Sequence, residues 1–254
     1  MNEIVVILIC LLVFLIAYSA LFTSTMFPET EVEKTTTTTE NEPKKEFNPT
    51  YTEATTIEVP AIDKDGGGVM ARLSVEAKPG IGRTLVDINQ ILLWVDTQDS
   101  IRIAKDTAEN ITEIDLSHQD IIYSVQANAS AIEGPSAGAA LCIATILELE
   151  NKTPNNKVTI TGTLNEDGEI GRISGVLAKA KAAKEAGMDL ILVPKGQKTY
   201  TNYTEEKKCE KYLFTEICRT GTKPEIVDIE KDSGIKIEEV GSIEEALKYF
   251  INVT

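Results

Sequence analysis

The stretch Glu133–Glu150, EGPSAGAALCIATILELE, places a serine hydroxyl at the start of a long apolar segment. Apolar residues run almost all the way round a helix drawn through this segment, which predicts a helix buried in the core. Ser136 would lie in its first turn, where unpaired backbone N–H groups can stabilise an oxyanion. Gly134 permits a tight turn and Pro135 presets φ for helix entry. A nucleophilic serine is one interpretation, and an N-capping serine in a Gly-Pro turn is the other.

A nucleophilic serine needs a base, and the chain contains a single histidine, His118, in the stretch LSHQD. A Ser-His-Asp triad would have to use this residue. The other way to activate a serine is a lysine that is neutral near physiological pH. Burial among apolar groups lowers the pKa of a lysine from ~10.4 by up to ~3–5 units. A lysine on a core-packed helix would therefore meet the requirement.

The segment Ser174–Gly187, SGVLAKAKAAKEAG, predicts such a helix, ended by its last glycine. Lys179 and Lys184 border its apolar face on opposite sides, so helical periodicity does not choose between them. Either could instead be a surface lysine whose aliphatic stem covers the core while its ammonium group reaches water.

The rest of the globular sequence predicts strands mixed with helices, which is an α+β order without an internal repeat. Alternating or continuous apolar runs bounded by glycine-rich turns are typical of strands, and 3.6-residue periodicity is typical of helices. The predicted strands cover 57–62, 68–77, 82–88, 119–127, 156–164 and 189–194; a helix covers 97–111, a turn 165–173, and a final strand and helix 235–253.

The N-terminal part of the chain predicts a membrane anchor followed by a stalk. Residues 4–22, IVVILICLLVFLIAYSALF, carry no charge and come close to the ~30 Å of a bilayer's hydrocarbon core. The run is longer than a typical signal-peptide core and no basic residue precedes it, which favours an uncleaved anchor over residues 1–27. Residues 28–56 are rich in Thr, Glu and Pro and predict a disordered stalk. The folded domain would then cover residues 57–254.

The side of the membrane on which this domain lies is indicated only by sequons and cysteines. The Lys/Arg bias that orients membrane segments is weak here. N-x-[ST] sequons stand at Asn110, Asn128, Asn151, Asn202 and Asn252, and Cys209 and Cys218 flank a short segment that could close a disulfide in an oxidising compartment. Unmodified sequons and two free thiols are the alternative. The balance favours a single-pass membrane protein with its domain on the extracytoplasmic side.

The charge excludes one class of partner. A net charge of -15, from 40 acidic and 25 basic residues, argues against binding nucleic acid, because cationic side chains supply that affinity. No pattern indicates a cofactor or a metal site.

Taken together, these motifs resemble the proteolytic domain of the Lon protease family, which uses a Ser-Lys dyad. The family's nucleophile motif stands here as EGPSAG, and its lysine segment as SGVLAKAKAAKEAG followed by MDLILVP. The resemblance makes Ser136 the nucleophile and selects Lys179 over Lys184 as the base. It implies that Thr161, in the preceding Thr-Gly pair, orients the amine, and it places Glu133 at the motif's acidic position without fixing a role.

The resemblance carries further expectations. It implies the fold of a Lon proteolytic domain, which is ribosomal protein S5 domain 2-like, polypeptide substrates, and assembly into a homo-oligomeric ring. The sequence lacks a G-x-x-x-x-G-K-[ST] loop, so peptide hydrolysis by this chain is expected to be ATP-independent. Residues 195–223 look like an insertion. The alternatives are a GHMP-kinase-like phosphotransferase, whose Gly/Ser-rich loop also opens a helix, and a catalytically silent interaction module.

Overall fold

The structure, a computed structural model, describes residues 54–87, 92–93, 95–127, 131–132, 135–213 and 215–251. The predicted anchor, residues 1–27, and all but the last three residues of the predicted stalk, 28–56, lie outside these ranges. None of the helices within these ranges is both long enough and apolar enough to span a membrane. The first described strand begins at Thr55, close to the predicted start of the domain.

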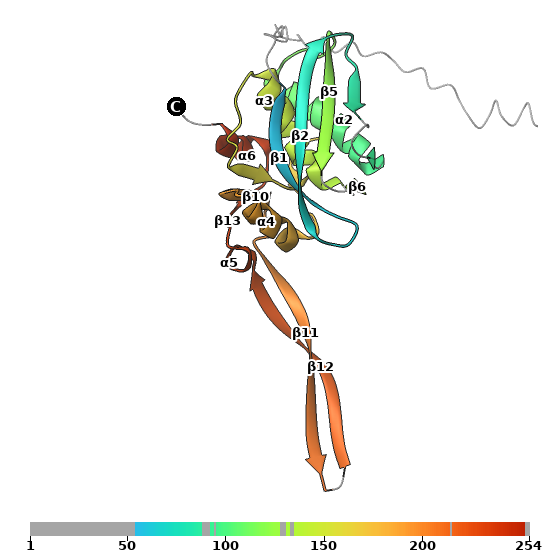
Figure 1. Cartoon of the computed structure of the whole chain (residues 1–254), viewed down its shortest axis with the longest axis vertical. Coiled ribbons are helices and arrows are strands. Elements are labelled where there is room, and N and C mark those ends of the chain that lie inside the picture. Colours follow the sequence, from blue (N-terminus) through green and yellow to red (C-terminus); the bar gives the residue numbers. More distant parts are fainter. Residues whose placement is uncertain are drawn as a thin grey trace, which may run out of the picture. The chain divides into compact units, whose positions relative to one another are not determined.

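A four-stranded sheet forms one side of the domain (Figure 1). Its strand order is β1-β2-β5-β3; β1 pairs with β2 and β2 with β5 in antiparallel fashion, whereas β3 and β5 are parallel. The inward side chains of β1, β2 and β5 alternate with more exposed ones, as expected for strands with one face on a core. The strands span Thr55–Ile62 (β1), Gly68–Pro79 (β2), Thr84–Asp87 (β3) and Gln119–Ala127 (β5).

The central helix α3, Gly138–Leu149, packs against β1, β2 and the long helix α2, Val95–Thr112. All twelve residues of α3 are buried, which confirms the helix predicted from an almost uniformly apolar sequence. α3 therefore lies at the centre of the main hydrophobic core, with α2 on one side and the sheet on another.

A second, parallel sheet has the strand order β13-β10-β7. Its middle strand is buried throughout: Leu190 and Leu192 belong to the main core, while Ile191 and Val193 face a smaller core formed with α4 and α5. Burial on both faces explains the continuous apolar run DLILVP. The elements are β7 (Val158–Ile160), α4 (Val176–Glu185), β10 (Leu190–Pro194), α5 (Ile229–Ser233), β13 (Lys236–Val240) and α6 (Ile243–Phe250).

Two short strand pairs complete the domain. β8, Thr163–Leu164, and β9, Ile170–Gly171, pair in antiparallel fashion and enclose residues 165–169, which lie within the turn predicted over 165–173. β4, Leu92–Leu93, and β6, Ala131–Ile132, form a parallel pair.

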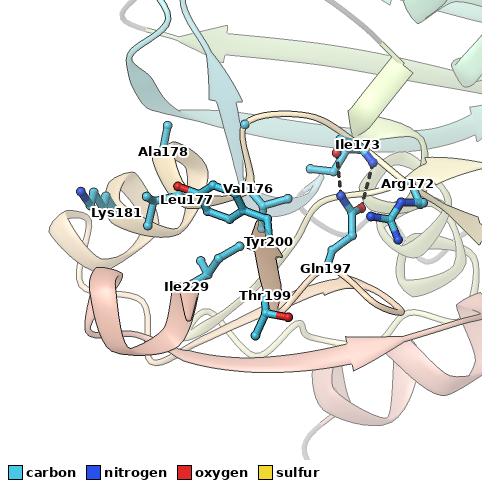
Figure 2. A pocket seen from close by; sticks show the side chains of 11 residues that line it. Arg172, Ile173, Val176, Leu177, Ala178, Lys181, Gln197, Thr199, Tyr200 and Ile229 are labelled. Carbon is cyan, nitrogen blue, oxygen red and sulfur yellow. Dashed lines mark hydrogen bonds between the residues drawn. The ribbon is translucent and has the colours of Figure 1, made fainter. Parts of the chain in front are cut away.

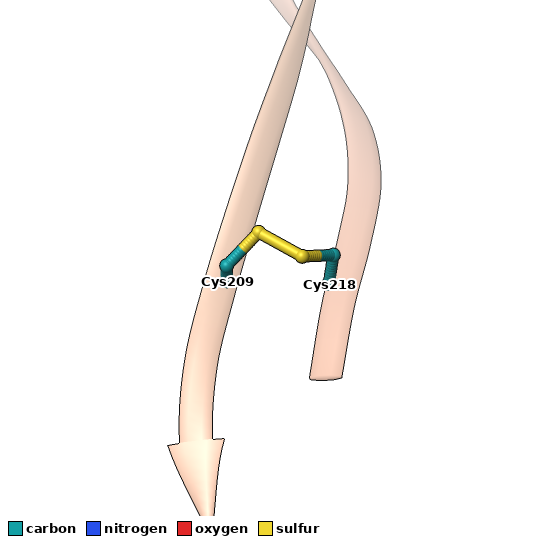
Figure 3. Close-up of a disulfide and its surroundings, with 2 residues drawn as sticks. All are labelled: Cys209 and Cys218. Carbon is teal, nitrogen blue, oxygen red and sulfur yellow. A yellow bond between two sulfur atoms is a disulfide. The ribbon is translucent and has the colours of Figure 1, made fainter. Parts of the chain in front are cut away.

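The predicted insertion is a two-stranded antiparallel ribbon, which we call the arm. It consists of β11, Thr199–Tyr212, and β12, Thr215–Asp228, and Cys209 and Cys218 are joined by a disulfide (Figure 3). The arm ends five residues beyond the predicted limit of 223, because strand pairing continues to Thr199 and Asp228 and the Asp228 carboxylate then caps α5. A ribbon without a third strand has little core of its own, so the disulfide stabilises it by limiting its unfolded conformations.

A buried carboxylate ties α3 to the four-stranded sheet. The two carboxylate oxygens of Glu148 accept hydrogen bonds from the backbone N–H groups of Thr55 and Ala77, each at 3.0 Å. Thr55 begins β1, and Ala77 lies beyond the last pair that β2 forms with β1. Glu148 therefore supplies the acceptors that a strand would otherwise provide at this point.

Replacing Glu148 with alanine is expected to lower the free energy of unfolding by about 2–3 kcal/mol, because two backbone donors lose their acceptors inside the protein. Thermal or urea unfolding followed by circular dichroism measures this change. Glu150→Ala is the matched control: Glu150 follows the same helix and forms an ion pair with Lys152 at the surface, so its loss should cost less than about 1 kcal/mol. Equal stability of the two variants would contradict the role given to Glu148.

Candidate active site

Ser136 lies in a single 3₁₀ turn, Pro135–Ala137, directly before α3. The sequence predicts it in the first turn of the α-helix itself, and the structure places it one turn earlier. Its carbonyl oxygen accepts a hydrogen bond from the Gly162 N–H at 2.9 Å, and the Ala139 N–H donates to the Gly162 carbonyl at 3.1 Å. These two bonds fix the serine turn to the segment that follows β7.

Glycine at position 162 leaves room for the side chain of Ile170 on β9. A Cβ atom at Gly162 would lie 2.4 Å from Cγ2 of Ile170 and 3.7 Å from Cβ of Ala139. The Ile170 side chain can therefore pack this closely against residue 162 only because that residue has no side chain, whereas the distance to Ala139 is an ordinary van der Waals contact.

Lys179 extends from the middle of α4 towards the serine turn. Its Nζ lies 2.7 Å from Oγ of Ser136 and 3.2 Å from Oγ1 of Thr161. The residue is 2% exposed, although it is a lysine. α4 contacts β1 and β2, and this packing brings Lys179 to the interior.

The surroundings of Lys179 change its acidity. Burial lowers the pKa of its ammonium group from the usual 10.5 to about 8, because the apolar interior disfavours the charged form. Roughly a tenth of the molecules then carry a neutral amine at pH 7. A neutral amine within hydrogen-bonding distance of a serine hydroxyl can accept its proton.

Thr161 connects the other two groups. Its hydroxyl accepts a hydrogen bond from the Lys179 amine and donates one to the Ser136 carbonyl oxygen at 3.3 Å. Thr161 is fully buried, so its side chain has a fixed environment. The structure thus brings together Ser136, Lys179 and Thr161, three of the five residues predicted for the site. The other two, Glu133 and Gly134, lie outside the described residues.

The two competing bases lie elsewhere. Lys184 is exposed on α4, so burial separates it clearly from Lys179. His118 is exposed in the turn before β5. Val125, near the far end of β5, lines a recess together with Ser136, whereas His118 precedes the first residue of that strand.

Two cavities reach the serine. A cleft of about 610 Å³ is lined by Ser136 and Lys179, together with Thr163, Arg172 and Gly175. A narrow apolar recess of about 40 Å³ also borders Ser136, with walls from β1, β2, β5, α2 and the start of α3. A peptide in the cleft can therefore present its carbonyl to Ser136 and one apolar side chain to the recess. Arg172 is a cleft residue that sequence reasoning missed; its only signal is a basic side chain in the turn before the lysine helix.

The described residues contain a single grouping of metal-ligand side chains, formed by Cys209, Glu216 and Cys218 on the arm. The two sulfur atoms are bonded to each other and cannot bind a metal as thiolates.

A buried lysine beside a serine at the start of a core helix, in an open cleft, defines a domain of the serine peptidase class. The chain matches a known family: residues 95–217 fit the model of the Lon protease (S16) C-terminal proteolytic domain. Residues 95–217 are thus identified as similar to a Lon protease family proteolytic domain.

Individual relatives agree with this family. The archaeal Lon protease of Thermococcus kodakarensis is 30% identical over 156 residues, which cover 58% of this chain and 24% of that protein. The archaeal Lon protease of Thermoplasma volcanium is 33% identical over 99 residues, 36% of this chain and 15% of that protein. The Lon protease of Phenylobacterium zucineum is 30% identical over 132 residues, 50% of this chain and 16% of that protein. The similarity thus spans at most about a quarter of these relatives.

Proposed function

We propose that this protein is a serine endopeptidase that hydrolyses peptide bonds of unfolded or extended polypeptides with a Ser136–Lys179 dyad. The observation that carries the proposal is the 2.7 Å contact between Oγ of Ser136 and a buried lysine amine whose pKa is lowered to about 8. A lysine with an ordinary pKa would be almost fully protonated at neutral pH and could not serve as a base.

In the proposed mechanism the neutral amine of Lys179 accepts the Ser136 hydroxyl proton as Oγ attacks the scissile carbonyl. Backbone N–H groups near Ser136 stabilise the oxyanion of the tetrahedral intermediate. The lysine ammonium then protonates the leaving amine, and a serine ester remains on the enzyme. Water hydrolyses this ester with the amine again acting as base. Thr161 holds Nζ in line with Oγ through both steps.

The shape of the site supports an extended substrate. A peptide must place its backbone along an open cleft and one side chain in the narrow recess beside Ser136, which a folded protein surface does not readily do. The recess is lined mainly by apolar side chains, so we propose a preference for apolar residues next to the scissile bond. Turnover would need no ATP in this chain.

The location of the enzyme is part of the proposal. A single-pass anchor over residues 1–27 would hold the domain at a membrane, and the Cys209–Cys218 disulfide supports an extracytoplasmic, oxidising compartment. A homo-oligomeric ring is the proposed assembly, which mass photometry of the detergent-solubilised protein would test.

The experiment that tests the proposed activity compares an unfolded and a folded substrate without nucleotide. We expect the purified protein to degrade casein without added ATP and to leave a stable globular protein intact. Ser136→Ala serves as the blank for contaminating proteases. The proposal fails if casein is degraded equally by both proteins, or only when ATP is present.

A further inference from the structure

A second cavity, of about 480 Å³, lies at the base of the arm (Figure 2). It borders the catalytic cleft, because the residues Arg172, Ile173 and Gly175 line both. The remaining walls come from the outer face of α4, from Thr199 and Tyr200 at the start of β11, and from Ile229 at the start of α5.

The wall shared by the two cavities is firmly held. The side-chain amide of Gln197 accepts a hydrogen bond from the Ile173 N–H at 2.9 Å and donates one to the Ile173 carbonyl at 2.7 Å (Figure 2). The Arg172 guanidinium donates to the Gly196 carbonyl at 3.2 Å. Paired bonds to both polar groups of one residue leave the wall little freedom, so the cavity exists before any ligand arrives.

The lining combines apolar surface with positive charge. Val176, Leu177, Ile229 and the ring of Tyr200 supply the apolar part. The charged residues among the lining side chains are Arg172 and Lys181, which lie at opposite ends of the cavity in Figure 2. In a chain with a net charge of -15, a cavity whose charged side chains are all cationic selects for carboxylates.

We propose that this cavity binds a stretch of the substrate polypeptide, a few residues from the scissile bond, that carries an apolar side chain and an acidic one. This inference rests on the proposed peptidase function. A polypeptide extended along the cleft passes the shared wall at Arg172 and Ile173 and enters the second cavity. Its apolar side chain packs on Leu177 and Tyr200, and its carboxylate pairs with a cation at either end.

The arm gives this cavity a specific feature. Tyr200 pairs with Val227 in the arm, one residue after the pair Thr199–Asp228 with which the arm begins. Its side chain is 41% exposed, so its ring is available to a ligand. The inserted ribbon thus forms one wall of a substrate-binding cavity next to the active site.

The experiment gives the full chain one quenched fluorogenic peptide and three extended versions of it. Each extension has six residues, in which Leu alternates with Glu, Leu with Lys, or Gly with Ser. Each is tested once at the N-terminus and once at the C-terminus of the peptide. We expect the Leu/Glu extension, on one end only, to raise kcat/KM about tenfold over the unextended peptide. The Leu/Lys and Gly/Ser extensions should give little gain.

Variants of the cavity's lining residues test whether the gain in kcat/KM comes from binding in this cavity. In Lys181→Glu and Tyr200→Ala, the ratio of kcat/KM for the Leu/Glu peptide to that for the unextended peptide should fall towards one. Lys184→Glu changes an exposed lysine of the same helix, and Tyr203→Ala removes a 66% exposed tyrosine of the same strand; neither residue lines the cavity. Both controls should keep the wild-type ratio.

Binding to Ser136→Ala protein, followed by fluorescence anisotropy of labelled peptides, separates this inference from the proposed function. One outcome is that the Leu/Glu peptide binds more tightly than the others, that this gain is lost in Ser136→Ala/Lys181→Glu, and that the wild-type chain cleaves no peptide. This outcome would support substrate binding by the cavity and refute the peptidase function. Cleavage of all peptides with equal kcat/KM, and equal binding, would overturn the cavity's role and leave the peptidase in place. If the kcat/KM ratio fell equally in Lys181→Glu and Lys184→Glu, the gain would come from general surface charge. This result would also overturn the proposed role of the cavity.

Discussion

Lys179→Met is expected to reduce peptide cleavage at least about a thousandfold, as is Ser136→Ala, because each removes one half of the dyad. Methionine keeps the length and apolar stem of lysine but has no group that accepts a proton. The measurement is kcat/KM for a fluorogenic peptide at pH 8. Since the two residues act as a unit, the double variant should be little worse than either single one.

The controls for this prediction are Lys184→Met and His118→Ala. Both residues are exposed and lie away from Ser136, so both variants should retain wild-type kcat/KM within about twofold. Loss of activity in His118→Ala with full activity in Lys179→Met would replace the dyad by a different catalytic arrangement.

Stability separates a catalytic effect from misfolding. The pKa of Lys179 is lower in the folded protein than in the unfolded chain, so the unfolded chain binds the proton more tightly. The charged lysine therefore lowers the free energy of unfolding, and this destabilisation is fully present below pH 8. It declines as pH rises from about 8 to 10.5. Replacing Lys179 by methionine removes it, and the free energy of unfolding at pH 7 should rise by about 3 kcal/mol or somewhat less. A more stable protein without activity is the expected signature of a catalytic lysine.

The second large effect concerns pH. Because the base must be neutral, kcat/KM should rise about tenfold per pH unit below pH 8 and level off above pH 9, following the lowered pKa of Lys179. Initial rates in buffers of constant ionic strength from pH 6 to 10 give this profile. A profile that is flat over the whole range would exclude an amine with this pKa as the base.

Much of the site could be predicted from sequence, because its parts lie on strongly patterned elements. The apolar run after Ser136 could form only a buried helix, and the small residues of 174–187 predicted the helix that carries Lys179. Periodicity alone did not separate Lys179 from Lys184. That choice depends on what packs on each side of α4, and its partners β1 and β2 lie about a hundred residues or more away in sequence.

Other features could not be predicted for physical reasons. The arm consists largely of polar and charged residues that are exposed on both faces, so it lacks the apolar alternation that indicates a strand. Glu148 is a charged residue in an otherwise apolar helix, and its partners Thr55 and Ala77 are 93 and 71 residues away. The cavity at the arm's base combines segments that only tertiary packing brings together.

The most direct test of the dyad is the rate at which a serine-reactive acylating probe modifies Ser136 as a function of pH, with the site identified by mass spectrometry. A single modification on Ser136, with a rate that rises through a pKa near 8 and falls at least about a hundredfold in Lys179→Met, is the predicted result. Equal, pH-independent labelling of Ser136 in the wild-type protein and in Lys179→Met would contradict the account, because the hydroxyl would then react without the lysine.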